Sequence, residues 1–388
     1  MPKKLKVVIA PDSFKGSLTA AEACDAIETG FRKVFPDVQI IKVPMADGGE
    51  GTVRSLVDST GGQMVFCDVT GPLGEKVKAF YGILGDGITA VIEMASASGL
   101  PLVPKDRKNP CLTTTYGTGE LIKAAIDKGC RRLIIGIGGS ATNDGGAGMA
   151  EALGIKFLDV NGSQIKRGGG FLGSLNTIDM SGLDPRVNET EFIIACDVDN
   201  PLTGSKGASA VYGPQKGATA EMVQVLDRGL SNFADVIKRD IGIDVKNIPG
   251  AGAAGGLGAG LIAFTSAKLK KGIEIVIDIT GFKEKLEGAD LVITGEGKTD
   301  FQTLFGKTPI GVANCAKEKD LPVIVISGGY SEDAVHLYKH GIDSLNTIVK
   351  GPCSIDDAIK RARDLMRDAA ESVARKIKIG MDIADRFK

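Results

Sequence analysis

One short segment, residues 133–149, constrains the fold of this chain more than any other part of the sequence. It reads LIIGIGGSATNDGGAGM, so an apolar run typical of a buried strand passes directly into a glycine-rich turn. Such a turn frees backbone N–H groups, which can surround the oxygens of a phosphate group. The segment therefore predicts a strand, turn and helix in an α/β protein that binds a phosphorylated ligand.

Two other interpretations of this segment stay open. Gly136, Gly138 and Ala141 fit the dinucleotide pattern G-x-G-x-x-A, and Asp159 follows near the acidic position expected there. A dinucleotide turn should enter its helix directly after Ala141, whereas N-D-G-G follows here at 143–146 and delays the helix to about residue 147. The remaining alternative is a strand-to-helix turn without any ligand.

Composition excludes several classes of function. The chain has 388 residues, which favours two domains. It carries 47 basic and 48 acidic residues with no long run of one sign, so the electrostatic footprint of a nucleic-acid-binding protein is absent. Aromatic residues make up 5% of the chain and there is no Trp, which leaves little material for stacking bases. A small polar substrate fits this composition better.

The sequence also favours a cytoplasmic protein with no membrane segment. The first apolar run stops at Ala10, too early for a signal peptide, and no segment has the apolar length of a membrane span. Seven scattered cysteines without a C-x-x-C pair indicate reduced thiols. His336 and His340 are the only histidines, and a solvated helix face explains their spacing better than a metal site does. Chemistry must rely on carboxylates, lysines and backbone amides.

The order of apolar runs predicts two domains, one of them discontinuous. Strands and helices alternate at both ends of the chain, whereas the middle begins with short alternating runs typical of an antiparallel meander. We expect residues 1–66 and 284–388 to form a Rossmann-like domain with a doubly wound parallel sheet, and residues 67–283 to form an inserted mixed α/β domain. The active site is expected in the cleft between them. A contiguous division near residue 190 is the alternative.

Several loops that follow predicted strands carry charged side chains. Asp12 and Lys15 follow the first strand, and together with nearby hydroxyls they suit a polyhydroxy acid, although Ser17 or Thr19 could simply cap the next helix. Asp47 follows the second strand and has the same alternative role as a helix cap. Lys307 stands at the start of a late predicted helix, where it could meet an anion.

A further loop holds two carboxylates in the sequence DVDNP at 197–201. In an extended segment, Asp197 and Asp199 project to the same face, which suits a general base beside a magnesium ligand. A plain turn before Pro201 is the alternative. The sequence G-K-T occurs twice after residue 296, but the preceding glycine of a P-loop is missing in both places.

Six loop segments combine these features: PDSFK at 11–15, PMADGGEGT at 44–52, GGSATNDGGAG at 138–148, DVDNPL at 197–202, GPQKGA at 213–218 and TGEG at 294–297. Taken together, they resemble the sequences of one family, the bacterial glycerate kinases of type I. The resemblance extends from about residue 6 to residue 376. Lys298 and Thr299 depart from the residues common in the family, with little bearing on function.

The resemblance implies a two-domain α/β enzyme that phosphorylates D-glycerate with ATP and Mg²⁺. It favours 2-phosphoglycerate as the product, with 3-phosphoglycerate as the alternative. An NAD(P)-dependent oxidoreductase and a non-catalytic hydroxy-acid sensor on a kinase scaffold are the competing functions. D-glycerate and ATP are the expected partners, with neither nucleic acid nor membrane among them, and a homodimer is left open.

Roles for individual residues are hypotheses from the chemistry of the loops. We expect Asp197 to be the general base and Asp199 the magnesium ligand. Asp12, Lys15, Asp47 and Lys307 would contact glycerate. The residues expected to hold the phosphates of ATP are Gly138, Gly139, Ser140, Asn143, Asp144, Gly145 and Gly146.

Overall fold

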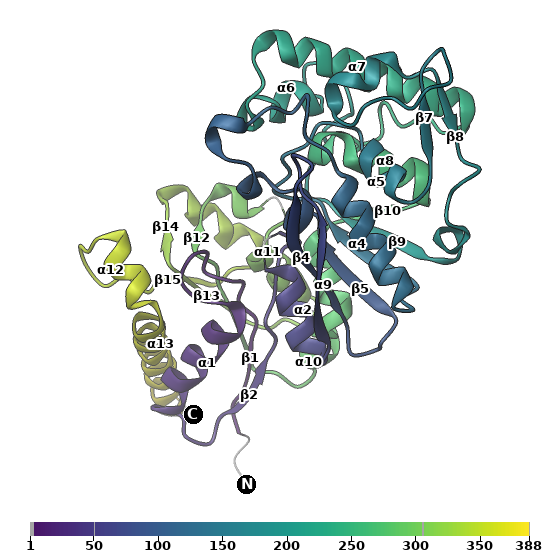
Figure 1. Ribbon diagram of the computed structural model, residues 1–388. Coiled ribbons are helices and arrows are strands. Elements are labelled where there is room, and N and C mark those ends of the chain that lie inside the picture. Colours follow the sequence, from purple (N-terminus) through teal and green to yellow (C-terminus); the bar gives the residue numbers. More distant parts are fainter. Residues whose placement is uncertain (1–3, 50, 305, 388) are drawn as a thin grey trace. The chain divides into compact units, whose positions relative to one another are not determined.

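The computed structural model describes residues 4–49, 51–304 and 306–387 and divides the chain into two units. The first unit contains the chain up to Asp47 and again from Gly272 onward, and the second contains Gly48–Lys271. Each unit has its own sheet (Figure 1). The α/β fold class with a discontinuous parallel-sheet unit is therefore confirmed.

The first unit is built on a five-stranded sheet in the order β15-β13-β11-β1-β2, with every neighbouring pair parallel. Continuous apolar runs form its central strands because helices cover both faces of such a sheet. Val7, Val8 and Ile9, for example, are all fully buried. The strands are β1 (Lys6–Ile9), β2 (Gln39–Lys42), β11 (Leu291–Thr294), β13 (Val323–Ser327) and β15 (Ser344–Thr347).

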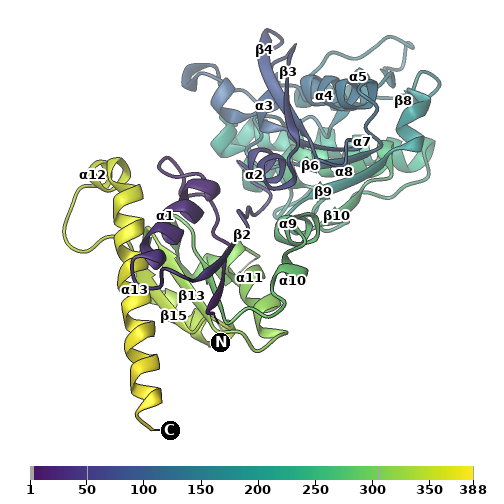
Figure 2. The same ribbon diagram turned by 90° about the horizontal axis from the view of Figure 1, so that it is seen from below.

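Helices pack on this sheet from two sides (Figures 1 and 2). Helix α1 (Ala20–Arg32) lies beside the long helix α13 (Ala362–Asp385), and both share a core with the side chains of Val7 and Ile9. Thr19 caps α1 through a reciprocal capping box with Glu22, so the capping role considered for Thr19 is confirmed. The other helices of this unit are α9 (Gly272–Thr280), α10 (Phe282–Lys285), α11 (Thr308–Lys317) and α12 (Ile355–Lys360).

Two elements of this unit differ from the periodicity of the sequence. The helical segment that begins at Ile355 breaks at Arg361, whose φ of −104° and ψ of 8° are not helical, and α13 then continues to Asp385. The segment Glu332–His340 forms a 3₁₀-helix. A short parallel pair, β12 (Lys298–Thr299) and β14 (Gly329–Tyr330), lies outside the main sheet.

The second unit has a mixed six-stranded sheet in the order β10-β9-β6-β5-β4-β3. Its three N-terminal strands form the expected antiparallel meander, and the remaining strands are parallel. The strands are β3 (Gln63–Thr70), β4 (Lys76–Ile83), β5 (Thr89–Glu93), β6 (Arg132–Gly136), β9 (Glu191–Ala195) and β10 (Lys268–Lys270), with β7 (Lys156–Leu158) and β8 (Thr177–Asp179) paired separately.

The helices of the second unit enclose one apolar core. Phe157, Phe233 and Phe264 meet there with ring centroids 5.7–6.1 Å apart. These helices are α2 (Thr52–Thr60), α3 (Ala95–Ser98), α4 (Tyr116–Asp127), α5 (Ala147–Ala152), α6 (Ala208–Tyr212), α7 (Ala220–Asp240) and α8 (Ala253–Thr265).

The unit boundaries lie at 47/48 and 271/272, not at the expected 66/67 and 283/284. Helix α2 belongs to the second unit because Glu93 on β5 accepts hydrogen bonds from the N–H groups of Gly51 and Val53. Helices α9 and α10 belong to the first unit, where Ile273 packs against Gly311 of α11. The expected boundaries were placed where the pattern of apolar runs changes along the sequence. The contacts of α2, α9 and α10 place these helices on the other side of those boundaries.

Glycines let the segment 142–146 lie directly against α7 and α8. A Cβ at Gly145 would lie 2.7 Å from the ring of Phe233, and one at Gly146 would lie 3.2 Å from the Cα of Gly260. Gly255 in turn touches the carbonyl of Thr142. Close packing therefore explains the glycines of the α8 segment, which the sequence alone could also assign to an anion site.

The buried position of Gly145 predicts a large loss of stability on substitution. Gly145→Val places a β-branched side chain at a φ of +64° and against Phe233. We expect the free energy of unfolding to fall by about 2–5 kcal/mol. Denaturant unfolding of Gly145→Val beside Gly173→Val measures this, since Gly173 is exposed with open space around it. Equal stability of the two variants would contradict the packing argument.

Candidate functional site

The polar residues of the first unit gather where the direction of strand order reverses. The chain goes from β1 to its neighbour β2 on one side, whereas from β11 it goes to β13 on the other side. Loops at the carboxyl ends of strands diverge at such a point and leave room for a ligand. Asp12 follows β1 and Glu296 follows β11, so their loops are neighbours, and the N–H of Asp12 donates to the carbonyl of Gly295 at 2.8 Å.

Asp12 has an unusual electrostatic environment. Its carboxylate accepts hydrogen bonds from the N–H of Ser13 and the hydroxyl of Thr308, both at 2.6 Å. Burial raises the pKa of Asp12 to about 7, and the negative charge of Asp47 acts in the same direction, while the two hydrogen bonds oppose the change and the charge of Glu296 adds to it. The carboxyl of Asp12 therefore exchanges its proton near neutral pH.

Glu296 lies beside Lys307 in the same cluster. It is 8% exposed and accepts hydrogen bonds from Thr303 at 2.6 Å and Thr299 at 3.2 Å. The Lys307 ammonium lies 3.6 Å from Glu296 and 3.8 Å from Asp300, and burial raises the pKa of Glu296. Glu296 was not predicted as a site residue, because nothing in the neighbouring sequence shows that its side chain turns inward toward Asp12.

The structure brings three of the four predicted glycerate-binding residues together. Asp12 and Asp47 act on each other electrostatically, and Lys307 joins them through Glu296. Lys15 is exposed one residue after Phe14, and its backbone runs past Gly297. Acidic groups outnumber lysines in this cluster. Protonation of Asp12 therefore reduces the net negative charge of the cluster.

In the second unit, the turn after β6 presents free backbone donors to solvent. Gly138 and Gly139 are exposed, and Ser140 is 6% exposed. Among the described residues, none accepts a hydrogen bond from the backbone N–H of Gly138, Gly139 or Ser140. Three successive unpaired N–H groups at an exposed turn form the kind of concavity that binds anions. We name residues 138–140 the phosphate turn.

Asp144, by contrast, is bonded within the protein. Its carboxylate is buried and accepts hydrogen bonds from the N–H and hydroxyl of Thr115 at 2.8 and 2.9 Å, and from the N–H groups of Gly146 and Gly148 at 3.3 Å. Burial raises its pKa. This carboxylate ties the beginning of α4 to the beginning of α5, which is a structural role.

The rest of the predicted phosphate-binding segment is buried as well. Asn143 donates its side-chain amide to Ser209 at 3.0 Å, and the N–H of Gly145 donates to the carbonyl of Gly255 at 3.0 Å. Because these donors have partners inside the protein, the contacts do not support a phosphate-binding role for Asn143, Asp144, Gly145 and Gly146. The exposed phosphate turn remains the candidate.

Lys216 is the functional candidate that the sequence analysis did not select. It lies in a 3₁₀-turn, Pro214–Lys216, and is 2% exposed. Its ammonium donates to the hydroxyl of Ser140 at 2.6 Å and to the carbonyl of Thr142 at 2.7 Å. The sequence GPQKG showed a lysine in a turn, but only the structure shows that this turn supports the phosphate turn 76 residues away.

Asp197 and Asp199 follow β9 on an exposed loop. Asn200 fixes this loop, since its amide donates to the carbonyl of Lys206 at 2.8 Å and its oxygen accepts from the hydroxyl of Tyr212 at 2.6 Å. Both carboxylates are thus accessible on an anchored segment. This arrangement is compatible with the base and metal roles expected for them.

A protein-only metal cage is absent from the part of the chain that the structure describes. No group of three or more His, Cys, Asp or Glu side chains is arranged to hold a metal ion within residues 4–49, 51–304 and 306–387. Magnesium in phosphoryl-transfer enzymes is commonly bound by one or two carboxylates together with substrate phosphates. Asp199 fits that pattern, because one accessible carboxylate is sufficient for it.

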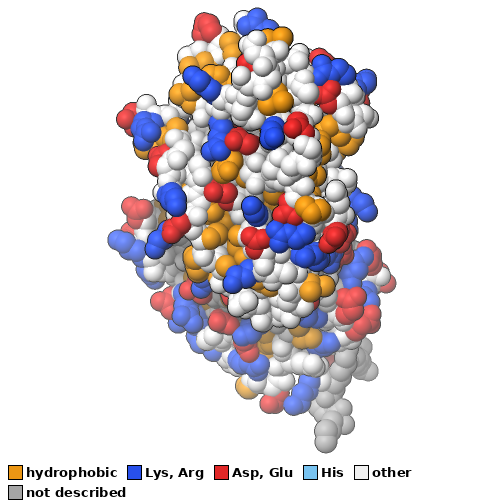
Figure 3. Space-filling model, turned by 45° about the vertical axis from the view of Figure 1, so that its right-hand side comes forward, with side chains coloured by type: hydrophobic (Ala, Val, Ile, Leu, Met, Phe, Trp, Pro, Cys, Tyr) orange, Lys and Arg blue, Asp and Glu red, His pale blue; other side chains and the backbone are white. Residues whose placement is uncertain are grey.

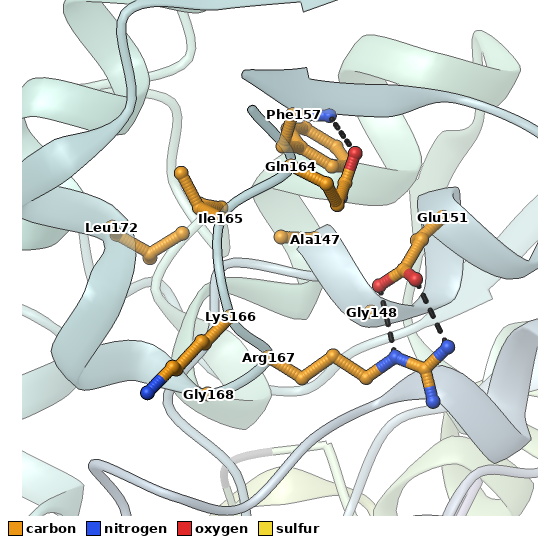
Figure 4. Close-up of a pocket in the computed structure, with 10 residues that line it drawn as sticks. All are labelled: Ala147, Gly148, Glu151, Phe157, Gln164, Ile165, Lys166, Arg167, Gly168 and Leu172. Carbon is orange, nitrogen blue, oxygen red and sulfur yellow. Dashed lines mark hydrogen bonds and ion pairs between the residues drawn. The ribbon is translucent and has the colours of Figure 1, made fainter. Parts of the chain in front are cut away.

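Two further views show the surface of the described residues. Lys and Arg side chains are interspersed with Asp and Glu over the face shown in Figure 3, in keeping with the balanced composition. Figure 4 shows a hollow beside α5 in which Arg167 forms an ion pair with Glu151 at 2.9 Å and Gln164 accepts from the N–H of Phe157. These polar groups already bond to one another, so the hollow offers little to a ligand.

The raised pKa of Asp12 predicts a pH-dependent effect on stability. Between its ordinary value of 3.8 and about 7, the folded state binds more protons at Asp12 than the unfolded state does. The contribution of Asp12 to stability is therefore present at low pH and is lost as the pH rises through about 7. The side chain of Asp12→Asn stays neutral at every pH. The free energy of unfolding of this variant, relative to that of the wild type, should therefore rise by about 1–3 kcal/mol between pH 4 and pH 8.

Denaturant unfolding of wild type and Asp12→Asn at a series of pH values measures this difference. Asp37→Asn, which removes an exposed carboxyl from the same unit, is the matched control. A difference between wild type and Asp12→Asn that stays constant with pH would contradict the electrostatic assignment.

Comparison with known proteins assigns the chain to a family. The model of the glycerate kinase family matches residues 7–378. The glycerate kinase of Bacillus subtilis (strain 168) is 58% identical over 375 residues, which cover 97% of this chain and 98% of that protein. The glycerate 2-kinase of Escherichia coli (strain K12) is 53% identical over 377 residues, which cover 97% and 99%.

A solved structure agrees with these sequence matches. A crystal structure of a Salmonella typhimurium LT2 protein, assigned as glycerate kinase 2, aligns with a TM-score of 0.91 at 52% identity and covers 98% of this chain and all of that one. In the described residues, no helix is long and apolar enough to cross a membrane. The matches extend over both units and support neither an oxidoreductase nor a sensor. The chain is an enzyme that belongs to the glycerate kinase family.

Proposed function

We propose that this enzyme transfers the γ-phosphoryl group of ATP to the secondary hydroxyl of D-glycerate and produces 2-phosphoglycerate. The observation that carries the proposal is the full-length match to a protein named glycerate 2-kinase, at 53% identity. Family membership supports the kinase activity, and the name of this relative favours the 2-position over the 3-position.

The phosphate turn is the proposed binding site for the phosphates of ATP. Its three unpaired N–H groups can donate to phosphate oxygens without first breaking a bond within the protein. A Cβ at Gly138 would meet nothing within 4 Å, so the space beside these donors is open to a ligand. Gly139 has a φ of +73°, which orients successive N–H groups to one side.

The cluster at the end of β1 and β11 is the proposed binding site for glycerate. Lys307, with Lys15 nearby, supplies positive charge for the substrate carboxylate. Asp12 and Asp47 supply oxygens for its hydroxyl groups, and Thr308 holds Asp12 in place. Because Asp12 titrates near neutral pH, it can either donate to a substrate oxygen or accept from a hydroxyl.

Asp197 is the proposed general base and Asp199 the proposed magnesium ligand. A carboxylate placed against the attacking hydroxyl accepts its proton as the phosphoryl group is transferred. Magnesium, when bound, neutralises the charge that develops on the phosphate oxygens. The anchored loop around Asn200 would hold both carboxylates in position for these tasks.

The position of phosphorylation is directly measurable. Purified enzyme with Mg²⁺, ATP and D-glycerate should give a phosphate monoester whose ³¹P signal couples to one carbon-bound proton, as in 2-phosphoglycerate. Coupling to two such protons would identify 3-phosphoglycerate and overturn the proposed position. L-glycerate and omission of the acid are the controls, and ADP release without any acid would contradict the activity itself.

Substitution of the two loop carboxylates separates their proposed roles. Asp197→Asn should lower kcat by about 10²–10⁴-fold, the usual contribution of a general base. Asp199→Asn should instead raise the Mg²⁺ concentration needed for half-maximal rate. Asp235→Asn, which removes an exposed carboxylate paired with Lys246, is the matched control. Turnover of Asp197→Asn within about tenfold of wild type would contradict the base assignment.

A further inference from the structure

Lys216 is a buried lysine without a carboxylate partner at bonding distance. It is among the largest fully buried side chains of the described residues. Its two hydrogen bonds go to a hydroxyl and a carbonyl, those of Ser140 and Thr142. A lysine is costly to bury in this way, because the protein loses the hydration of the ammonium and gains no neutralising contact. The arrangement therefore requires an explanation beyond packing.

The hydrogen bond to Ser140 determines what the serine hydroxyl can do. When Lys216 is protonated it has three donors and no acceptor, so the oxygen of Ser140 must then accept from it. The proton of the Ser140 hydroxyl is then left for another acceptor, and no described residue accepts it. Because Ser140 ends the phosphate turn, its hydroxyl extends the row of three backbone donors by one side-chain donor.

The surroundings of Lys216 are polar but incompletely bonded. The hydroxyl of Thr142 and the side-chain oxygen of Asn143 are buried without a partner among the described residues. Burial lowers the pKa of Lys216 to about 7, and the negative charge of Asp144 opposes this change. Among the described residues, Asp144 is the charged side chain that acts electrostatically on the ammonium of Lys216. Above neutral pH, the lysine is thus largely uncharged until another anion approaches.

We propose that Lys216 is a positioning residue for the nucleotide: it holds Ser140 so that its hydroxyl donates to a phosphate oxygen, and it takes up a proton when the phosphates bind. This inference rests on the proposed role of the phosphate turn. A bound phosphate near Ser140 places negative charge close to Lys216, and an opposite charge at that distance favours the protonated ammonium. Nucleotide binding is therefore coupled to proton uptake at a residue that does not itself touch the reacting atoms.

Calorimetric titration of the full-length enzyme with Mg²⁺–ADP tests the coupling. Titrations near pH 8, in buffers of different ionisation enthalpy, give the number of protons taken up on binding. We expect an uptake approaching one proton for the wild type, because Lys216 is mostly neutral at that pH. Binding without proton uptake would overturn the proposal, and this measurement needs no variant.

Two substitutions of Lys216 separate position from charge. Lys216→Met should abolish the uptake and raise the Kd for ADP and the KM for ATP by roughly tenfold or more, with an unchanged KM for glycerate. Lys216→Arg keeps a permanent charge, so it should bind ADP more tightly than Lys216→Met and still show no uptake. Persistent uptake in either variant would assign the proton to another group and overturn the inference.

Ser140→Ala provides the second arm and remains informative if Lys216→Met fails to fold. It should raise the Kd for ADP by no more than Lys216→Met does, and the double variant should be no weaker than Lys216→Met alone, because both substitutions remove the same donor. Additive losses would show that Lys216 does not act through Ser140.

A separate control tests the phosphate turn itself. Gly138→Val fills the open space beside the donors, and Gly173→Val adds the same side chain at an exposed glycine elsewhere in the unit. If Gly138→Val leaves ADP affinity equal to that of Gly173→Val, the proposed phosphate site is wrong. If Gly138→Val weakens ADP binding but the wild type takes up no proton on binding ADP, the phosphate turn is supported and the proposed role of Lys216 is wrong.

Discussion

The buried carboxylate of Asp144 is the contact on which the candidate nucleotide site depends. Its four hydrogen bonds fix Thr115 at the beginning of α4 and Gly146 and Gly148 at the beginning of α5. A carboxylate that is removed from water is stable only when such donors replace its hydration. Asp144 thus holds the C-terminal part of the segment 138–148 inside the protein. At the N-terminal end of the same segment, Gly138 and Gly139 lie at the surface with unpaired backbone donors.

The other unit places its polar residues by a different physical rule. Parallel strands send their loops to one edge of the sheet, and the order β2-β1-β11-β13 opens that edge between β1 and β11. Asp12, Asp47 and Glu296 accumulate there. Burial is the main cause of the raised pKa of Asp12, and the negative charges of Asp47 and Glu296 add to it. The two units thus offer complementary chemistry: unpaired donors in one, and titratable acids with a lysine in the other.

The sequence predicted the strands and the acidic loops well, because both signals are local. Apolar runs marked β1, whose run stops at Ala10, and β6, whose run begins at residue 133, to within a residue or two. Charged residues that follow β1 and β9 marked Asp12 and Asp197. Contacts between distant segments left no such signal. Neither the burial of Lys216 beneath Ser140 nor the inward turn of Glu296 can be inferred from neighbouring residues. The glycines at 145 and 146 were ambiguous for a related reason, since close helix packing and anion binding both select the smallest residue.

That double use of glycine has a consequence for recognising such proteins. Gly145, Gly146, Gly255 and Gly260 lie where two stretches of backbone touch, and each must remain glycine for the loop and α8 to meet. A descendant that no longer bound nucleotide would still need all four to fold. A glycine signature in this segment is therefore inherited with the architecture, whereas the exposed Gly138 and the serine that follows Gly139 are the positions that only the proposed nucleotide site would constrain.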